Sequence, residues 1–225
     1  MKTKNRELKI IFLLIGSLFL FFLLYPTGRL LLKSFVSEQG MTGAFYTEVL
    51  SERGFLTALG NSFLIAGVSA FLTTVLAFFL AYTIHYTNVN PVFKKGIEKA
   101  AVLPMFLPTL TYGFAIIYSF GKQGMLTKLF GRQLFDIYGF NGLLIGYVIY
   151  TLPVSFLLIH NTMGYIDKKF MIVSRVMGDN RCSTFMMTIF RPLAGTLMAS
   201  FIQSFFLCFT DFGIPTSVGG KFEVI

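Results

Sequence analysis

The sequence predicts an all-α protein, a polytopic helix bundle embedded in a membrane. Of its 225 residues, 55% are hydrophobic and 28 are Phe, and the mean hydropathy is +0.72, outside the balance of a soluble domain. A helix needs about 20 apolar residues to cross a hydrocarbon core of roughly 30 Å. Five runs approach or reach this length, so we expect about five spans: 10–24, 62–84, 100–120, 142–159 and 193–210.

The first run is short as a purely apolar segment, but it continues through YPTGR (25–29) into three leucines. Arg29 can extend its charge to the headgroups while its stem stays in the apolar layer. A signal peptide is the competing interpretation, because basic residues precede the run and its length is modest. No small-residue cleavage pattern follows the run, which favours a membrane span.

The second run contains small residues at a spacing that suits close helix packing. Ala66 and Ala70 form one pair four residues apart, and Ala77 and Ala81 form another. Residues at this spacing lie on one face of a helix, and small side chains there let a neighbouring backbone approach. We therefore expect this face to be buried against other helices.

The third run contains two prolines four residues apart, which remove two backbone donors within one helical turn. We expect this helix to be bent or locally unwound. Such a break can expose carbonyls and hydroxyls to a translocation path, or it can serve packing alone. A proline near the middle of the fourth run acts similarly. The candidate pore or kink residues are Pro104, Pro108, Thr109, Thr111, Tyr112 and Pro153.

The distribution of charge predicts the orientation of the chain. With the N-terminus in the cytoplasm, the segments 2–9, 94–99 and 168–191 lie on the inner side and hold most of the 19 basic residues. Basic residues are retained in short cytoplasmic loops, so nearly all of the net charge of +9 follows from topology. Because these residues are dispersed over three loops, we expect no nucleic-acid partner. The sequence predicts a multi-pass protein of the cell (inner) membrane.

The sequence carries no pattern for internal chemistry. The five runs contain no acidic or basic residue of the kind that coupled carriers keep at membrane depth. His85 and His160 fall at inner helix ends, where we expect solvated side chains. There is no phosphate loop, no metal-ligand cluster and no nucleophile paired with a base. We therefore expect no catalytic residue, no metal and no cofactor in this chain, so any energy for transport must come from another subunit.

A polar interruption, FMIVSRVMGDNRCSTFMMTIFRPL (170–193), separates the last two runs. In it, three residues separate Ile172-Val173-Ser174 from Gly178, and nine more residues separate Gly178 from TIFRP (188–192). This arrangement resembles the loop of the permease subunits of type I ABC importers, whose pattern is EAA, three residues, Gly, nine residues, then Ile-x-Leu-Pro. The glutamate and both alanines are replaced here, and the proline falls one position late.

The resemblance is collinear over nearly the whole chain. The last matching segment, which contains Asp211, Phe212 and Gly213, is similar to one in permeases of the ferric iron and aminoethylphosphonate branch. The other matches are LYPTGRLLLKSF, the Asn61-Ser62 pair, the LP-x-x-x-P helix at 103–108 with its following Phe-Gly turn, and Leu152-Pro153 with Asp167.

The resemblance implies that the 164–192 loop forms a coupling helix that docks on an ATPase subunit, which binds ATP and magnesium. Small residues would let that helix seat closely. It also implies an extracytoplasmic substrate-binding protein, a second permease unit (a homo- or heterodimer, or a fused second half) and surrounding lipid as partners. The implied substrate is ferric iron or an organophosphonate, with a polyamine as an alternative. The coupling residues carried over by position are Met171, Ile172, Val173, Ser174, Arg175 and Gly178.

We expect two domains, an N-terminal span with an outer loop at 1–60 and a transmembrane core domain at 61–225. The resemblance implies that the core lacks a sixth helix and is truncated; a complete five-span protein is the alternative. An ATP-independent channel, a carrier-like protein or a scaffold is a second functional class. The sequence has neither an intramembrane charge nor a selectivity-filter glycine run to favour that class.

Overall fold

The computed structural model describes residues 2–37, 40–52, 54–220 and 222–224. Its contacts divide the chain into two compact units, Met1–Leu56 and Thr57–Ile225. The first unit ends at Leu56, near the start of the helix α3 (Phe55–Tyr86). The boundary expected after residue 60 is slightly further along the same helix.

The first unit consists of a long helix, a short hairpin and a short helix. The helix α1 (Lys2–Lys33) continues through Pro26 well beyond the apolar run that predicts it. The strands β1 (Val36–Ser37) and β2 (Gly40–Met41) pair antiparallel, and α2 (Ala44–Ser51) follows. The Ser34 and Tyr46 hydroxyls lie 2.6 Å apart and join the two ends of the hairpin. The apolar part of α1 has no buried residue.

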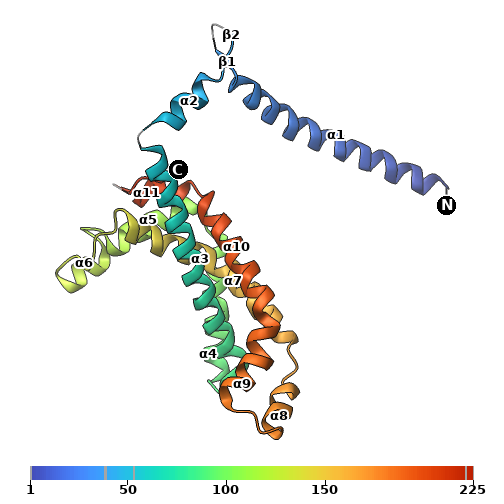
Figure 1. Ribbon diagram of the computed structural model, residues 1–225, viewed down its shortest axis with the longest axis vertical. Helices are drawn as coiled ribbons and strands as arrows, with labels where there is room; N and C mark the ends of the chain where they lie inside the picture. Colours follow the sequence, from blue (N-terminus) through green and yellow to red (C-terminus); the bar gives the residue numbers. More distant parts are fainter. Residues whose placement is uncertain (1, 38–39, 53, 221, 225) are drawn as a thin grey trace. The chain divides into compact units, whose positions relative to one another are not determined.

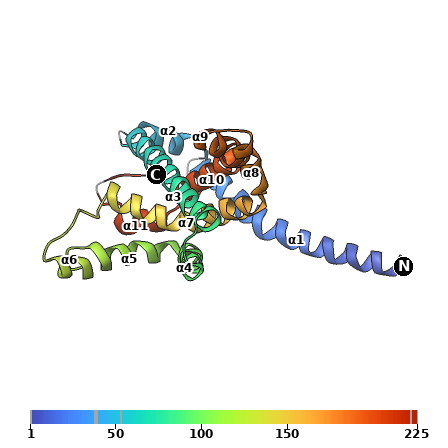
Figure 2. The same cartoon turned by 90° about the horizontal axis from the view of Figure 1, so that it is seen from below.

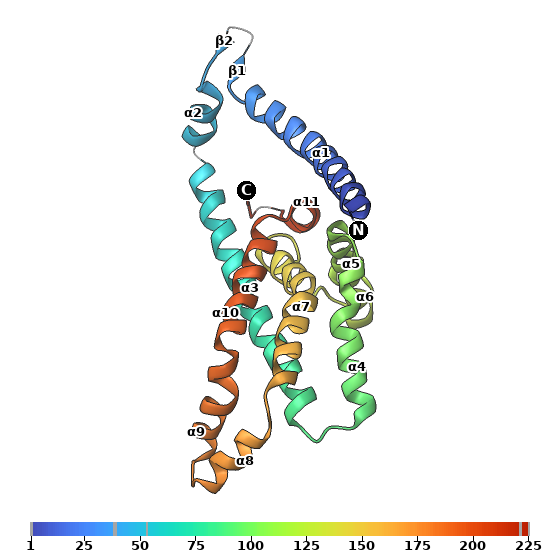
Figure 3. The same cartoon turned by 90° about the vertical axis from the view of Figure 1, so that its right-hand side faces the viewer.

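The second unit is a bundle built around α3, α7 and α10, which run side by side (Figures 1 and 3). In chain order it contains α3, α4 (Pro91–Val102), the 3-10 helix η1 (Leu103–Phe106), α5 (Thr109–Phe120), α6 (Met125–Phe130), α7 (Phe140–Tyr165), α8 (Lys169–Val176), α9 (Arg181–Phe185), the π-helix η2 (Met186–Phe190), α10 (Arg191–Phe209) and α11 (Gly213–Val218). The helices α8 and α9 lie at one end of this unit and α5 and α11 at the other (Figure 1).

Small residues allow the bundle helices to approach closely, as the sequence predicts. Ala66, Ala70, Ala77 and Ala81 of α3 are all fully buried. Two apolar clusters fill the interior, one around Tyr147 and Ile214 and the other around Phe156 and Leu193. The alanine face of α3 contributes to both clusters.

Among the described residues, four helices are long and apolar enough to cross a membrane: Arg6–Lys33, Phe55–Tyr86, Phe140–Tyr165 and Arg181–Phe209. A fifth is present if the bent pair Pro91–Phe106 and Thr109–Phe130 counts as one span. The described part of the chain is therefore an all-α, multi-pass membrane fold, which confirms the predicted fold class. Its one sheet is the two-stranded hairpin of the first unit.

The predicted third span is two helices that meet at a bend of 115°. In Figure 2, α4 is seen end-on while α5 lies in the plane of the view. Leu107 between them is extended (φ −100°, ψ 139°), the conformation that a following proline imposes on its neighbour. By contrast, α7 continues as one helix through Pro153.

Candidate functional site

The helix α8 of the predicted coupling loop is held at both ends by local hydrogen bonds. At its start, the Lys169 backbone N–H donates to Oδ1 of Asp167 over 2.9 Å. At its end, the Gly178 N–H donates to the Arg175 carbonyl and the Asp179 N–H to the Ser174 carbonyl, both over 3.1 Å. This pair of bonds is a Schellman motif, and Gly178 takes the left-handed conformation (φ +86°) that the motif requires.

Ser174 faces the interior of the loop. It is 9% exposed, its Oγ donates to Oδ2 of Asp179 over 2.6 Å, and it lies 3.0 Å from Oγ1 of Thr184 in α9. The helix α9 is capped by Asn180, whose Oδ1 accepts from the Ser183 N–H over 2.8 Å. Ser174 therefore ties α8 to α9 and leaves other side chains of α8 to form its outer surface.

That outer surface is largely apolar, although Lys169 and Arg175 are also exposed. Val176 is 82% exposed and Met177 79%, and Phe170, Ile172 and Val173 are also exposed. Met171 and Arg175 line a separate polar cavity between α8, α9 and α3. A group of exposed apolar side chains on one short helix is typical of a surface that meets another protein.

The break between η1 and α5 is packed against α11. The Tyr112 hydroxyl donates to the Pro104 carbonyl across the bend, and the Thr111 N–H donates to the Pro108 carbonyl over 2.9 Å. Thr109 meets Gly213 so closely that a Cβ on Gly213 would lie 2.2 Å from Oγ1 of Thr109. The structure thus brings five of the candidate kink residues together, while Pro153 is buried separately within α7.

Asp211 serves as a helix cap in the outer segment. Its Oδ2 accepts from the Ile214 backbone N–H over 2.9 Å, at the start of α11. Phe212 beside it is 79% exposed, whereas Gly213 is buried. The local hydrogen bond gives Asp211 a structural role, and any contact with a transported substrate stays a prediction.

The bundle contains hydroxyl contacts between helices that were not predicted from the sequence. Thr73 of α3 and Thr151 of α7 lie 2.9 Å apart, and Ser155 of α7 and Ser204 of α10 lie 2.6 Å apart. All four side chains are buried. Serines and threonines inside predicted spans were the available signal, because polar groups in lipid-embedded helices seek partners on neighbouring helices.

The two histidines lie together, contrary to the expectation of solvated side chains. His85 Nε2 is 3.2 Å from His160 Nδ1 and 3.1 Å from the His160 carbonyl oxygen, and both residues are partly buried. His160 Nε2 is 3.9 Å from Oε1 of Glu98 in α4. The residues are 75 positions apart in the chain, so only the fold reveals this contact.

No group of three or more His, Cys, Asp or Glu side chains in the described ranges is arranged to hold a metal ion. The two cysteines, Cys182 and Cys208, are both free.

The known proteins that are similar to the chain in sequence include permease proteins of several transport systems. The chain is 26% identical over 213 residues to the ferric transport system permease protein FbpB of Actinobacillus pleuropneumoniae, covering 92% of this chain and 31% of the relative. It is 27% identical over 163 residues to the thiamine transport system permease protein ThiP of Salmonella typhimurium, covering 71% of this chain and 30% of the relative. The chain thus spans about a third of the length of these relatives. No protein-family model matches it.

The fold is also found among solved structures. A bacterial ABC transporter involved in the import of the acidic polysaccharide alginate matches with a TM-score of 0.73 at 12% identity, covering 97% of this chain and 82% of the other. The same kind of transporter in complex with an alginate-bound periplasmic protein matches with a TM-score of 0.69 at 14% identity, covering 90% and 73%. The chain thus shares its fold with a bacterial ABC transporter and is similar in sequence to ferric and thiamine transport system permease proteins.

Proposed function

We propose that the chain forms part of the translocation path of an ATP-driven importer for ferric iron and couples to separate ATPase subunits through the 164–192 loop. The observation that carries this proposal is the exposed apolar surface of α8, which is fixed by an Asp167 cap and a Gly178 turn but has nothing to cover it among the described residues. Such a surface is stabilised when a partner removes it from water.

The orientation follows from the same assignment. With the N-terminus in the cytoplasm, α8 faces the compartment that contains ATP, and the basic loops are retained on that side. ATP and magnesium then bind to the partner ATPase, and this chain supplies no catalytic residue. A substrate-binding protein delivers the substrate on the outer side, and a second permease unit completes the path.

The choice of ferric iron rests on the relatives, of which two are ferric transport permeases. An organophosphonate is the second substrate class that the sequence resemblance favours, and relatives named for thiamine and sulfate transport widen the range. Uptake of radiolabelled ferric iron, measured in competition with aminoethylphosphonate, separates the two leading classes.

The coupling surface is tested by Val176→Asp, which places a charge on the most exposed apolar position of α8. We expect the ATPase to be lost on purification and ferric uptake to fall at least about tenfold, since a charge in a desolvated contact costs on the order of 2 kcal/mol or more. Val92→Asp is the matched control, because Val92 lies on α4 and is 77% exposed.

Normal uptake and a retained ATPase in the Val176→Asp variant would contradict the coupling assignment. Uptake that persists in ATP-depleted cells would instead favour the channel or carrier alternative. Uptake is measured with the full-length protein in its native membrane, and retention of the ATPase is measured on the protein purified from that membrane.

A further inference from the structure

A polar cavity and an apolar groove adjoin each other at the α8 end of the bundle. The cavity, about 590 Å³, lies between α3, α8 and α9 and is lined by Arg175, Asp179 and Arg181. The groove, about 460 Å³, lies between α3 and the η2–α10 helix. They share a wall, because the Phe185 ring of the cavity lies 6.2 Å, centroid to centroid, from the Phe78 ring of the groove.

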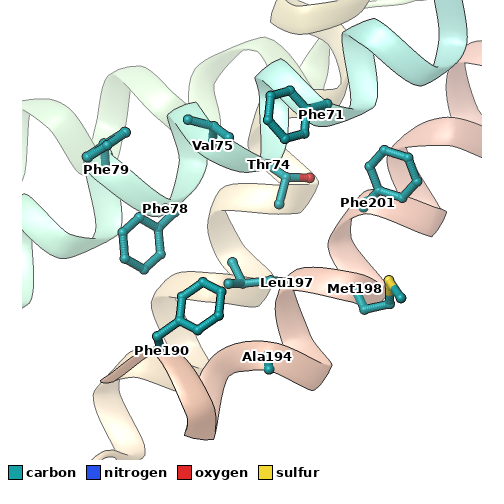
Figure 4. Close-up of a pocket in the computed structure, with 10 residues that line it drawn as sticks. All are labelled: Phe71, Thr74, Val75, Phe78, Phe79, Phe190, Ala194, Leu197, Met198 and Phe201. Carbon is teal, nitrogen blue, oxygen red and sulfur yellow. The ribbon is translucent and has the colours of Figure 1, made fainter. Parts of the chain in front are cut away.

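The groove is lined almost entirely by hydrocarbon. Figure 4 shows Phe71 and Phe78 on the α3 wall, with Phe190 and Phe201 on the opposite wall. Thr74 is the one hydroxyl among the lining residues, and it already donates to the Ala70 carbonyl over 2.8 Å. The groove therefore offers dispersion contacts and burial of apolar surface, but no free polar group.

The cavity at the end of the groove is suited to an anion. Among the described residues, no carboxylate lies within 4 Å of the Arg175 or Arg181 guanidinium. Asp179 also lines the cavity, but its carboxylate accepts the short hydrogen bond from Ser174. Arginine binds phosphate oxygens through paired N–H donors, so two arginines in one cavity favour a phosphate group.

The dimensions match one leaflet of a bilayer. Arg181 begins the candidate span Arg181–Phe209, so the cavity lies at the level of the headgroups. From Tyr82, in the cavity wall, to Phe71, at the far part of the groove, α3 rises about 16 Å. This length is about half of a hydrocarbon core of roughly 30 Å.

We propose that the cavity and groove bind one anionic phospholipid, with its phosphate on Arg175 and Arg181 and an acyl chain along the phenylalanine-lined groove. The lipid joins the loop helices α8 and α9 to the spanning helices α3 and α10, so it stabilises the position of the loop. A helix of a second protein fits the groove alone, whereas the charged end and the length together fit a phospholipid. The proposal requires membrane insertion only, so it can fail independently of the transport function.

The test uses the absence of tryptophan from the chain, which makes one introduced tryptophan the sole reporter. Phe190→Trp places it in the groove wall. The purified full-length protein is reconstituted in phosphatidylcholine vesicles containing a small fraction of brominated phosphatidylglycerol or of brominated phosphatidylcholine. We expect about tenfold stronger quenching per brominated lipid for phosphatidylglycerol, given two arginines near an anionic headgroup. A Phe206→Trp protein, whose reporter is on an exposed part of α10, serves as the bulk-lipid control and should show no preference.

Adding Arg175→Gln and Arg181→Gln to the Phe190→Trp protein should abolish the preference. Arg191→Gln, which removes one positive charge outside the cavity, should preserve it. Equal quenching by the two lipids at position 190 would mean ordinary bulk lipid and would overturn the proposal. Protection from both lipids would mean that a protein covers the groove and would also overturn it. A preference that survives the double arginine substitution would refute the headgroup assignment. If the double variant fails to fold, the comparison of the two lipids in Phe190→Trp still decides the outcome.

Discussion

The interior of the helical bundle and the loop from Asp167 to Phe190 differ in where they place their polar and apolar side chains. In the bundle, some buried hydroxyls pair across helices, as Ser155 does with Ser204, and fully buried alanines fill the contacts. In the loop, the polar groups are paired locally through Ser174 and the Gly178 turn, while large apolar side chains face outward. The bundle interior is therefore filled by its own side chains, whereas the loop leaves an apolar surface that no described residue covers.

The difference separates residues that maintain the fold from residues that act on a partner. A change in the bundle interior should lower stability whatever the protein transports. A change on the outer surface of α8 should leave the fold intact and alter coupling. The following substitutions test whether this division holds.

The largest effect is expected for Gly142→Ala, at the start of α7. A Cβ there would lie 1.8 Å from the Ile137 carbonyl oxygen and 3.2 Å from Cβ of Val218, so the backbone must move. We expect a loss of about 3 kcal/mol of unfolding free energy or failure to accumulate, as for severe overpacking. The free energy of unfolding is measured in mixed detergent micelles. Gly67→Ala is the control, because no atom lies within 4 Å of its Cβ; similar stability of the two variants would contradict the packing argument.

The next effect is expected for Gly178→Leu in the loop. A Cβ at Gly178 meets nothing within 4 Å, so the cost comes from the left-handed backbone and amounts to about 1–2 kcal/mol, confined to the end of α8. We expect the protein to insert and fold normally but to lose uptake. Gly96→Leu, in an equally open position of α4 without a positive φ, should retain uptake. Normal uptake by Gly178→Leu would remove the coupling role of this turn.

Much of this division was accessible from the sequence. The alanine spacing predicts the buried face of α3, because small residues four apart share one helical face. The paired prolines predict the bend before α5, because Pro108 forces Leu107 to be extended. The 115° angle was not accessible, since it also depends on the packing of α11 against α5.

Other features depend on contacts between distant residues. Ser174 occupies a position that the family pattern gives to a small residue, but its inward direction depends on Thr184 in the next helix. The contact between His85 and His160 joins separate helices. The periodicity of each segment alone identifies neither partner.

A smaller effect is expected where the loop meets the span. The proline of the loop motif falls one position late at Pro192, and the preceding turn is a π-helix in which the Arg191 N–H donates to the Met186 carbonyl five residues back. A turn of this kind holds one residue more than an α-helical turn. We therefore expect deletion of Met187 to convert it to α-helix at a cost below about 1 kcal/mol. Deletion of Met198, within the regular part of α10, should rotate the following residues out of the bundle and prevent folding. Equal loss of folded protein in both deletions, measured by size-exclusion chromatography, would contradict this explanation.

The smallest effect tests whether the bundle is held by its hydroxyl pairs or by packing. Ser155 and Ser204 are separated by 2.6 Å and both are buried, so each is the other's partner in an apolar environment. A double-mutant cycle with Ser155→Ala and Ser204→Ala should give a coupling energy of about 0.6 kcal/mol, the usual value between membrane helices. A cycle between Ser155→Ala and Thr83→Ala, whose hydroxyl bonds within α3, should give none. If the Ser155–Ser204 coupling is also absent, close packing of small residues accounts for the stability of the bundle. The bundle and the loop then differ only in how closely their side chains are packed.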